Sequence, residues 1–259
     1  MSPRARFESV RTLVQWGNVA VRIHSLYSRA ASAESLPVVF VPGLGASSRT
    51  MLPTARLVMP ARAVFTVDLP SHGESENPSH RPSLRDYAGV LGAWHDALGL
   101  ERAVLVGHSF GSQVLVELAS ERAAVVAGLV LISPTVEPRA RTVIAQIARL
   151  LVDAPREPLS LTGLLLWDYV RTGFRGLRDL GAAAIQDRVE DKLPSITAPT
   201  LLVRGARDPL VPEDWAKQIA SLLPHARLVV IPRGTHAVQY QAADAVARAL
   251  NQFLHQLSP

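Results

Sequence analysis

The residues of this chain best suited to chemistry form a Gly-x-Ser-x-Gly motif, Gly107-His108-Ser109-Phe110-Gly111. An apolar run precedes the motif and a helical pattern follows it directly. The sequence therefore predicts a strand, a sharp turn and a helix, with Ser109 at the apex of the turn. Such a turn exposes a serine hydroxyl as a nucleophile, and glycines suit its flanks because a Cβ there would crowd neighbouring backbone. The alternative is that Ser109 only caps the N-terminus of the helix.

A serine nucleophile needs a general base, usually a histidine that is oriented by a carboxylate. Asp208 and His236 each follow an apolar, strand-like run, in the chain order Ser, Asp, His that accompanies this turn. Taken singly, an aspartate before proline is typical of a turn, and a loop histidine is typically solvated. Together the three positions predict Ser109 as nucleophile, His236 as base and Asp208 as the orienting acid, with Glu137 as the next acid to consider.

Acyl transfer also requires backbone N–H groups that stabilise a developing oxyanion. The N–H of Phe110, at the start of the predicted helix, is one candidate donor. The second is the N–H of Leu44, in a loop where Gly43 and Gly45 allow close approach of the backbone to a substrate. A phosphate-binding loop is the competing interpretation of these glycines, but no Gly-Lys-Ser/Thr sequence follows them.

These residues must be positioned by alternating strands and helices. The sequence predicts an α/β fold in which an antiparallel hairpin at Gly17-Asn18 leads into a mostly parallel sheet of eight strands flanked by helices. The expected strands are Arg11–Trp16, Val19–His24, Pro37–Val41, Ala63–Asp68, Ala103–Gly107, Val126–Ile132, Thr200–Arg204 and Arg227–Ile231. The expected helices are Leu84–Leu98, Gln113–Ser120, Glu213–Leu223 and Ala242–Leu257. The carboxyl ends of parallel strands share one sheet edge, where we expect the predicted triad.

The alternation breaks between residues 135 and 195, which carry helical periodicity and no convincing strand. We predict a helical insertion there, lying over the carboxyl edge of the sheet, with residues 1–134 and 196–259 forming the core. Ordinary crossover helices are the alternative. The apolar stripe within this segment, together with two later valines, suggests a substrate pocket: Leu164, Leu165, Trp167, Val211 and Val238.

Composition limits the other functions. The formal net charge is +5, but the basic residues are scattered among acids, so nucleic-acid binding is not expected. Cysteine is absent, which excludes disulfides and thiolate metal sites, and we expect neither a metal nor a cofactor. The chain has no apolar run of membrane-spanning length, and the stretch from Met1 to Glu8 lacks the apolar region of a signal peptide, so a cytoplasmic location is expected. The oligomeric state is left open.

Over nearly its whole length the chain resembles the α/β-hydrolase superfamily. Besides the serine motif, Asp68-Leu69-Pro70-Ser71-His72-Gly73-Glu74-Ser75 resembles that family's Asp-x-x-Gly-x-Gly-x-Ser loop, with Ser71 where glycine is common. Pro42-Gly43 stands where the family usually has His-Gly; that histidine is structural in most members, so its loss should not remove catalysis. The resemblance implies that the insertion is a cap that roofs the substrate pocket.

The fold hosts many reactions, so the substrate must be argued from the site. A serine nucleophile argues against haloalkane dehalogenases and epoxide hydrolases, which use aspartate there. Carbon–carbon bond hydrolases usually carry Gly-Asn-Ser and an aromatic residue after the catalytic histidine, where this chain has His108 and Ala237. We expect a small-molecule carboxylic ester with a small to medium apolar part. Cofactor-free lyases, carbon–carbon bond hydrolases, perhydrolases and a non-catalytic binding protein of the same fold are the alternatives.

Overall fold

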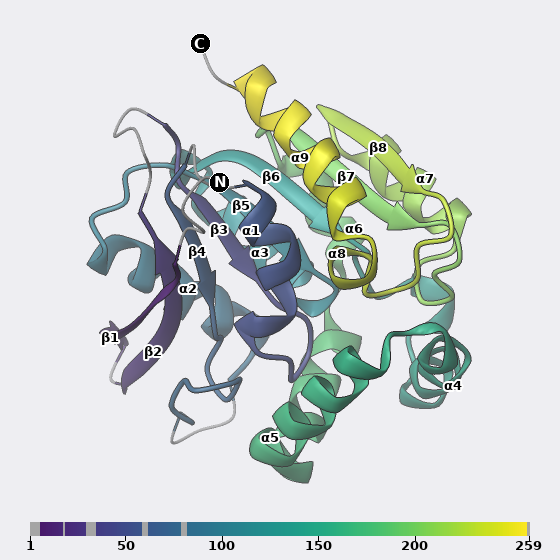
Figure 1. Ribbon diagram of the computed structural model, residues 1–259, viewed down its shortest axis with the longest axis horizontal. Coiled ribbons are helices and arrows are strands. Elements are labelled where there is room, and N and C mark those ends of the chain that lie inside the picture. The colour runs from purple at the N-terminus through teal and green to yellow at the C-terminus, as the bar shows by residue number, and fades with distance from the viewer. Residues whose placement is uncertain (1–5, 18, 30–34, 59–61, 79–81, 258–259) are drawn as a thin grey trace.

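The computed structural model describes residues 6–17, 19–29, 35–58, 62–78 and 82–257, and it contains one eight-stranded sheet (Figure 1). The strands lie in the spatial order β1-β2-β4-β3-β5-β6-β7-β8. Their bounds are β1 Glu8–Trp16, β2 Val19–Ser28, β3 Val38–Val41, β4 Val64–Val67, β5 Ala103–His108, β6 Val126–Ile132, β7 Thr200–Gly205 and β8 Ala226–Ile231. All eight coincide with the expected runs to within a few residues.

The hairpin at the start of the sheet is confirmed. β1 and β2 pair antiparallel up to Trp16 opposite Val19, and Gly17 has a positive φ of 55°, which the turn requires. Asn18, the other expected turn residue, lies outside the described residues. β2 also pairs antiparallel with β4, and every later pairing, from β4–β3 to β7–β8, is parallel.

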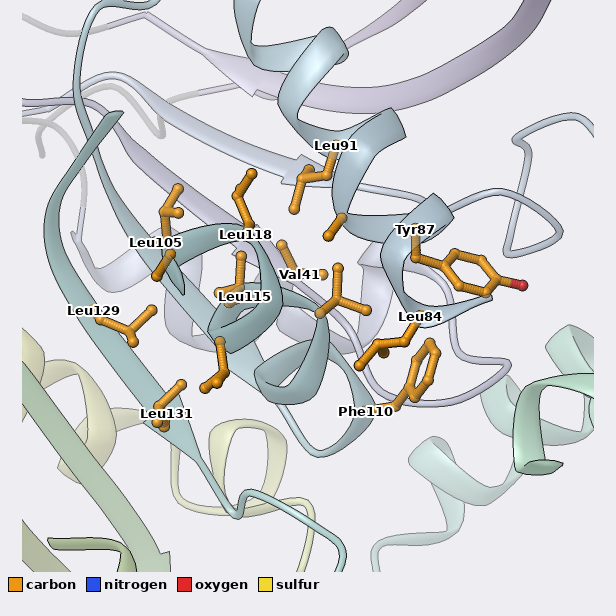
Figure 2. Packing of buried hydrophobic residues seen from close by; sticks show 14 of the residues in the cluster. Val41, Leu84, Tyr87, Leu91, Leu105, Phe110, Leu115, Leu118, Leu129 and Leu131 are labelled. Carbon is orange, nitrogen blue, oxygen red and sulfur yellow. The ribbon is translucent and has the colours of Figure 1, made fainter. Parts of the chain in front are cut away.

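Helices cover both faces of the sheet because its central strands are apolar on both faces. The covering helices are α1 Leu52–Val58, α2 Leu84–Ala97, α3 Phe110–Glu121, α7 Glu213–Leu222, α8 Val238–Gln241 and α9 Ala243–Leu257. Along β3, Val39 and Val41 point into the core beneath α2 and α3, whereas Val38 and Phe40 point into the core beneath α1 and α9. Figure 2 shows the first of these two cores, where strand residues meet leucines of α2 and α3.

Residues 135–195, between β6 and β7, contain helices and no strand. They are α4 Val143–Asp153, α5 Leu159–Gln186 and α6 Val189–Lys192, with short 3₁₀ turns at Pro138–Ala140, Ala154–Arg156 and Leu193–Ser195. α5 is kinked at Gly173, whose φ of 70° and ψ of 164° are not helical. α4 and α5 lie together at one end of the molecule, beyond the carboxyl ends of the parallel strands (Figure 1). Among the described residues, none of the helices combines the length and the apolar character that a membrane span needs.

Candidate active site

Ser109 occupies the sharp turn between β5 and α3. Its backbone has a φ of 51° and a ψ of −117°, a conformation that costs energy for any residue with a side chain. Its N–H donates to the carbonyl of Ile132, at the end of the neighbouring strand β6, over 2.9 Å. Its side chain makes no capping hydrogen bond to α3, so the simpler interpretation of Ser109 as a helix cap is wrong.

The two flanking glycines are required by the tightness of this turn. A Cβ on Gly107 would lie 2.7 Å from backbone atoms of Gly111 and Ser112, and a Cβ on Gly111 would lie 2.5 Å from the carbonyl oxygens of Val41 and Pro42. These contacts are shorter than any side chain tolerates, and the opposing atoms are backbone that cannot move away. The motif is therefore a steric requirement of the turn, as the sequence predicted.

The three residues predicted as a triad form one hydrogen-bonded chain. His236 Nε2 lies 3.0 Å from Ser109 Oγ, and His236 Nδ1 lies 3.0 Å from Asp208 Oδ2. All three side chains come from loops at the carboxyl ends of strands, and all three residues are at least nine-tenths buried. The second oxygen of Asp208 accepts the N–H groups of Leu210 and Val211, which fixes the plane of the carboxylate.

The pKa values of Asp208 and His236 are shifted by burial and by each other. Burial alone would raise the pKa of Asp208, but the charge and the hydrogen bond of His236 hold that pKa below its ordinary value. Burial likewise opposes the charged form of His236, yet the Asp208 carboxylate beside it raises the pKa of the imidazole above its ordinary 6.5. An ionised Asp208 next to His236 is the arrangement that stabilises an imidazolium over a neutral ring.

The sequence did not reveal how the backbone of the histidine loop is held. His108, inside the serine motif, donates from Nε2 to the carbonyl of His236 over 3.1 Å. Burial lowers the pKa of His108 to about 3, so the ring is neutral. The variable residue of the motif thus links the serine turn directly to the loop that carries His236.

Two carboxyl groups, one on the last residue of α4 and one just after it, also hold this loop. The His236 N–H donates to Asp153 Oδ1 over 3.3 Å, and the Ala237 N–H donates to Glu157 Oε1 over 2.9 Å. Burial, together with the hydrogen-bonded Glu157 carboxyl beside it, raises the pKa of Asp153 to about 7. An acid pair four residues apart in an apolar stretch is the sequence signal that could have found them, because such a pair is costly unless it has partners.

The glycine loop after β3 is tied down by two aspartates. The N–H of Ser47 donates to Asp168 of α5 over 2.7 Å, and the N–H of Ser48 donates to Asp68, after β4, over 2.6 Å. A Cβ on Gly43 would lie 3.4 Å from Ser109 Cβ, so this loop lies directly against the nucleophile turn. These contacts put Leu44 beside the turn. The roles of the Leu44 and Phe110 N–H groups as oxyanion donors stay predictions.

The Asp68 loop explains the second motif of the resemblance. Besides Ser48, the Asp68 carboxylate accepts the N–H of Glu74 over 2.9 Å and bonds to His24 over 2.7 Å. Gly73 has a φ of 50°, and a Cβ there would lie 2.3 Å from the Asp68 carboxylate. Asp68 therefore connects the loop after β3, which lies against the Ser109 turn, to the loop after β4.

The side chains predicted to line a pocket occupy different environments. Val211 and Val238 are fully buried within the two hydrophobic cores. Leu164 and Leu165 on α5 are half-buried, and the Trp167 side chain is 57% exposed. Their contact with a substrate stays a prediction.

Glu137, the second candidate for the triad acid, has another partner. Its carboxylate lies 2.5 Å from the guanidinium of Arg149. One residue near the nucleophile was not foreseen: Thr135 Oγ1 lies 3.3 Å from Ser109 Oγ, within hydrogen-bond reach of the hydroxyl.

The fold and this geometry define a class. An eight-stranded, mostly parallel sheet with a strained serine between β5 and α3 is the α/β-hydrolase arrangement. The family model described as "Alpha/beta hydrolase family" matches residues 38–249. The chain belongs to the α/β-hydrolase family, and it is a hydrolase by that membership.

Individual relatives name different reactions. The chain is 29% identical to a Pseudomonas savastanoi protein named "Putative carbamate hydrolase RutD", over 88% of this chain and 96% of that one. It is 28% identical to the dihydrolipoyllysine-residue acetyltransferase component of the acetoin cleaving system of Pseudomonas putida, over 84% of this chain, and spans 63% of that relative's length. The enol-lactonase from Burkholderia xenovorans superposes with a TM-score of 0.82 at 22% identity, over 95% of this chain and all of that one.

Proposed function

We propose that this protein is a serine hydrolase that cleaves carboxylic esters of small to medium apolar substrates through an acyl-enzyme. The observation that carries the proposal is the unbroken chain of hydrogen bonds from Ser109 Oγ through His236 to Asp208, set at a strained turn. A structural serine does not need that strain, whereas a nucleophile that must project from the sheet does.

Each step has a residue to perform it. His236 Nε2 takes the proton of Ser109 as Oγ attacks the ester carbonyl, and the oxyanion that forms is met by the N–H groups of Leu44 and Phe110. The intermediate collapses, the C–O bond breaks, and the imidazolium returns its proton to the leaving alkoxide. Water then attacks the acyl-enzyme with His236 again as base, which frees the acid and restores Ser109. No step requires a cofactor.

The helical segment 135–195 supports this proposal as a cap. α5 reaches the glycine loop through Asp168, and Glu157 and Asp153 reach the histidine loop, so both sides of the site are in contact with the segment. Leu164 and Leu165 are half-buried apolar side chains of the segment and the first candidates to contact an acyl chain. A segment placed in this way selects substrates by apolar area, at roughly 1–3 kcal/mol per methylene.

Carbamates are the second candidate substrates, because of the relative that carries that name. A carbamate presents the same carbonyl to the same nucleophile and differs in the nitrogen beside it. Carbon–carbon bond hydrolysis, lyase and perhydrolase chemistry use the same triad. A non-catalytic binding protein would not need the aligned base and acid.

A matched series of p-nitrophenyl esters and p-nitrophenyl carbamates tests the proposal. We expect turnover of the esters, a burst of p-nitrophenol equal to one acyl group per enzyme where deacylation is slow, and weaker turnover of the carbamates. Ser109→Ala is the control that removes the nucleophile. Carbamate turnover exceeding ester turnover would reassign the substrate class, and no turnover of either series by folded protein would refute the proposal.

A further inference from the structure

The exposed apolar side chains of this protein are concentrated on α4 and α5. Eleven of the fourteen large hydrophobic residues that are exposed among the described residues lie in the segment 135–195. Scattered exposed hydrophobics are ordinary, but a concentration on one element marks an interaction surface. The eleven are Val143, Ile144, Ile147, Leu150, Leu151, Val152, Leu159, Leu166, Trp167, Val170 and Phe174.

α4 is an amphipathic helix whose polar face, and not its apolar face, contacts the rest of the protein. Its polar side chains Gln146, Arg149 and Asp153 share one face and bond to the rest of the protein, through Ala140, Leu210 and His236 respectively. Its apolar residues repeat at positions i, i+1, i+4, i+7 and i+8 from Val143, which places them on the other face, and none of them is buried. The helix therefore binds the protein through its polar face and presents its apolar face to the solvent.

α5 continues this pattern before its kink. Leu159, Leu166 and Val170 follow helical spacing, and their exposed fractions are 89%, 61% and 77%. Trp167 lies on the same side of the helix. Since α4 and α5 lie at the same end of the molecule (Figure 1), two apolar helical faces are available to one partner.

Among the described residues of this segment, the exposed charges without an ion-pair partner are positive. Within residues 135–195 each acid is buried, ion-paired or bound to a backbone N–H: Glu137, Asp153, Glu157, Asp168, Asp179, Asp187, Glu190 and Asp191. Arg139, Arg156, Arg171 and Arg175 are exposed, and no carboxylate of the described residues pairs with them. Within the described part of the chain, the hydrogen bonds of the Arg156 and Arg171 side chains go to backbone carbonyls.

We propose that the exposed apolar faces of α4 and α5, with these four arginines, form a docking surface for an anionic lipid membrane. Helices with an apolar face and flanking arginines lie in the membrane interface, where apolar burial and attraction to anionic headgroups act together. A second copy of the chain fits less well, because a twofold interface would bring like-charged arginines together. This inference concerns binding and does not depend on which bond the triad cleaves.

Vesicle binding tests the surface without involving turnover. Full-length protein is mixed with ether-linked phosphatidylcholine vesicles, with and without ether-linked phosphatidylglycerol, so that ester cleavage cannot change the lipid. We expect sedimentation with the anionic vesicles and a shift of Trp167 fluorescence to shorter wavelength. The reporter is specific because Trp94 and Trp215 are fully buried and Trp16 is only partly exposed. Trp167→Phe should remove the shift while sedimentation persists.

Matched variants locate the contact. Ile144→Glu and Val170→Glu should each weaken binding about tenfold or more, because a carboxylate replaces apolar area that would enter the lipid. Leu13→Glu, at a leucine 62% exposed on β1, is the control and should bind as the parent does. Replacing Arg139, Arg156 and Arg175 together by Gln should weaken binding to anionic vesicles, whereas Arg248→Gln on α9 should not.

Three outcomes would overturn the proposal. The first is no binding by folded protein to anionic vesicles. The second is binding that Leu13→Glu weakens as much as Ile144→Glu does. The third is a dimer in sedimentation that Ile144→Glu dissociates, which would assign the faces to a second copy. Hydrolysis of a soluble acetyl ester by the same samples separates failure of this surface from failure of the catalytic proposal.

Discussion

The described residues of the protein form two Ser–His–Asp hydrogen-bond chains of nearly the same dimensions. In one, Ser109, His236 and Asp208 are joined by contacts of 3.0 and 3.0 Å. In the other, Ser9 Oγ lies 3.0 Å from His24 Nε2, and His24 Nδ1 lies 2.7 Å from Asp68. Distances between the three side chains therefore do not separate a catalytic arrangement from a structural one.

The backbone conformation at the serine distinguishes the two hydrogen-bond chains. Ser109 has a positive φ and lies directly before α3, and the N-terminus of a helix is a place where backbone N–H groups can stabilise an oxyanion. Ser9 lies within β1, paired antiparallel opposite Leu26. Its N–H and carbonyl therefore belong to a strand, and no helix begins beside it. The second chain lacks the donors that acyl transfer requires.

The two aspartates also differ in what they hold. One carboxylate oxygen of Asp208 accepts the N–H groups of Leu210 and Val211, and the other contacts His236. Asp68 accepts N–H groups from Ser48 and Glu74, and so connects two loops. A carboxylate–imidazole pair is therefore the candidate base in one region and a connection between two loops in the other.

Substitution of each serine should give the largest difference between the two hydrogen-bond chains. Ser109→Ala should lower kcat by about 10⁴–10⁶, because the nucleophile is lost, whereas Ser9→Ala should stay within about threefold. Ester turnover and the site of a fluorophosphonate adduct, mapped by peptide mass spectrometry, check this. An adduct on Ser9, or a Ser109→Ala variant with parental kcat, would reverse the comparison.

The next largest effect is expected from substitution of Asp208. Asp208→Asn should lower kcat by about 10²–10⁴ while leaving the fold intact, because control of the His236 tautomer is lost. Steady-state kinetics with circular dichroism as a folding control measure this. If the variant kept the parental kcat, another group would have to orient His236, and Glu137 would be tested in the same way despite its bond to Arg149.

Removal of the structural histidine should act on stability instead. His24→Ala leaves the buried Asp68 carboxylate without one hydrogen-bond partner, so the free energy of unfolding should fall by about 1–3 kcal/mol. Turnover at a temperature well below the unfolding transition should stay within about tenfold. Urea unfolding followed by fluorescence gives the first quantity. Unchanged stability with kcat lost would show that His24 serves the chemistry.

The smallest effect concerns pH. Because catalysis needs neutral His236 and its pKa is raised, activity should be lost as the pH falls through a value above about 6.5. The charge of Asp153 contributes to that rise, so Asp153→Asn should move the acid limb of kcat/KM to lower pH. The plateau kcat should change by no more than about threefold, since asparagine still accepts the His236 N–H.

Glu213→Gln, an exposed glutamate on α7, is the control and should leave the pH profile in place. An acid limb that Asp153→Asn leaves in place, or moves to higher pH, would contradict the assignment. It would show that the Asp153 carboxyl holds the loop without acting on the base.

The sequence by itself determined the sheet and the order of the chemistry. The hairpin signal at Gly17-Asn18 predicted the first two strands. Apolar runs that end in loops predicted the later strands, because strands covered on both faces are apolar along most of their length. The glycines of the serine motif predicted the strained turn, since only residues without a Cβ fit there. His236 and Asp208 could be chosen because parallel strands bring their carboxyl ends to one edge.

Tertiary structure decided what the periodicity of the sequence could not. The helical pattern of α4 predicts an amphipathic helix, and the usual expectation is an apolar face turned inward. In the fold, Asp153 bonds to the His236 N–H and Arg149 to Glu137, so the polar face is the one held against the protein. Likewise, the spacing of Ser9, His24 and Asp68 in the sequence does not predict a second Ser–His–Asp hydrogen-bond chain. The physical reason is the same in both cases. The spacing of residues shows which side chains share a face of a helix or strand. The tertiary contacts then decide which partners that face meets.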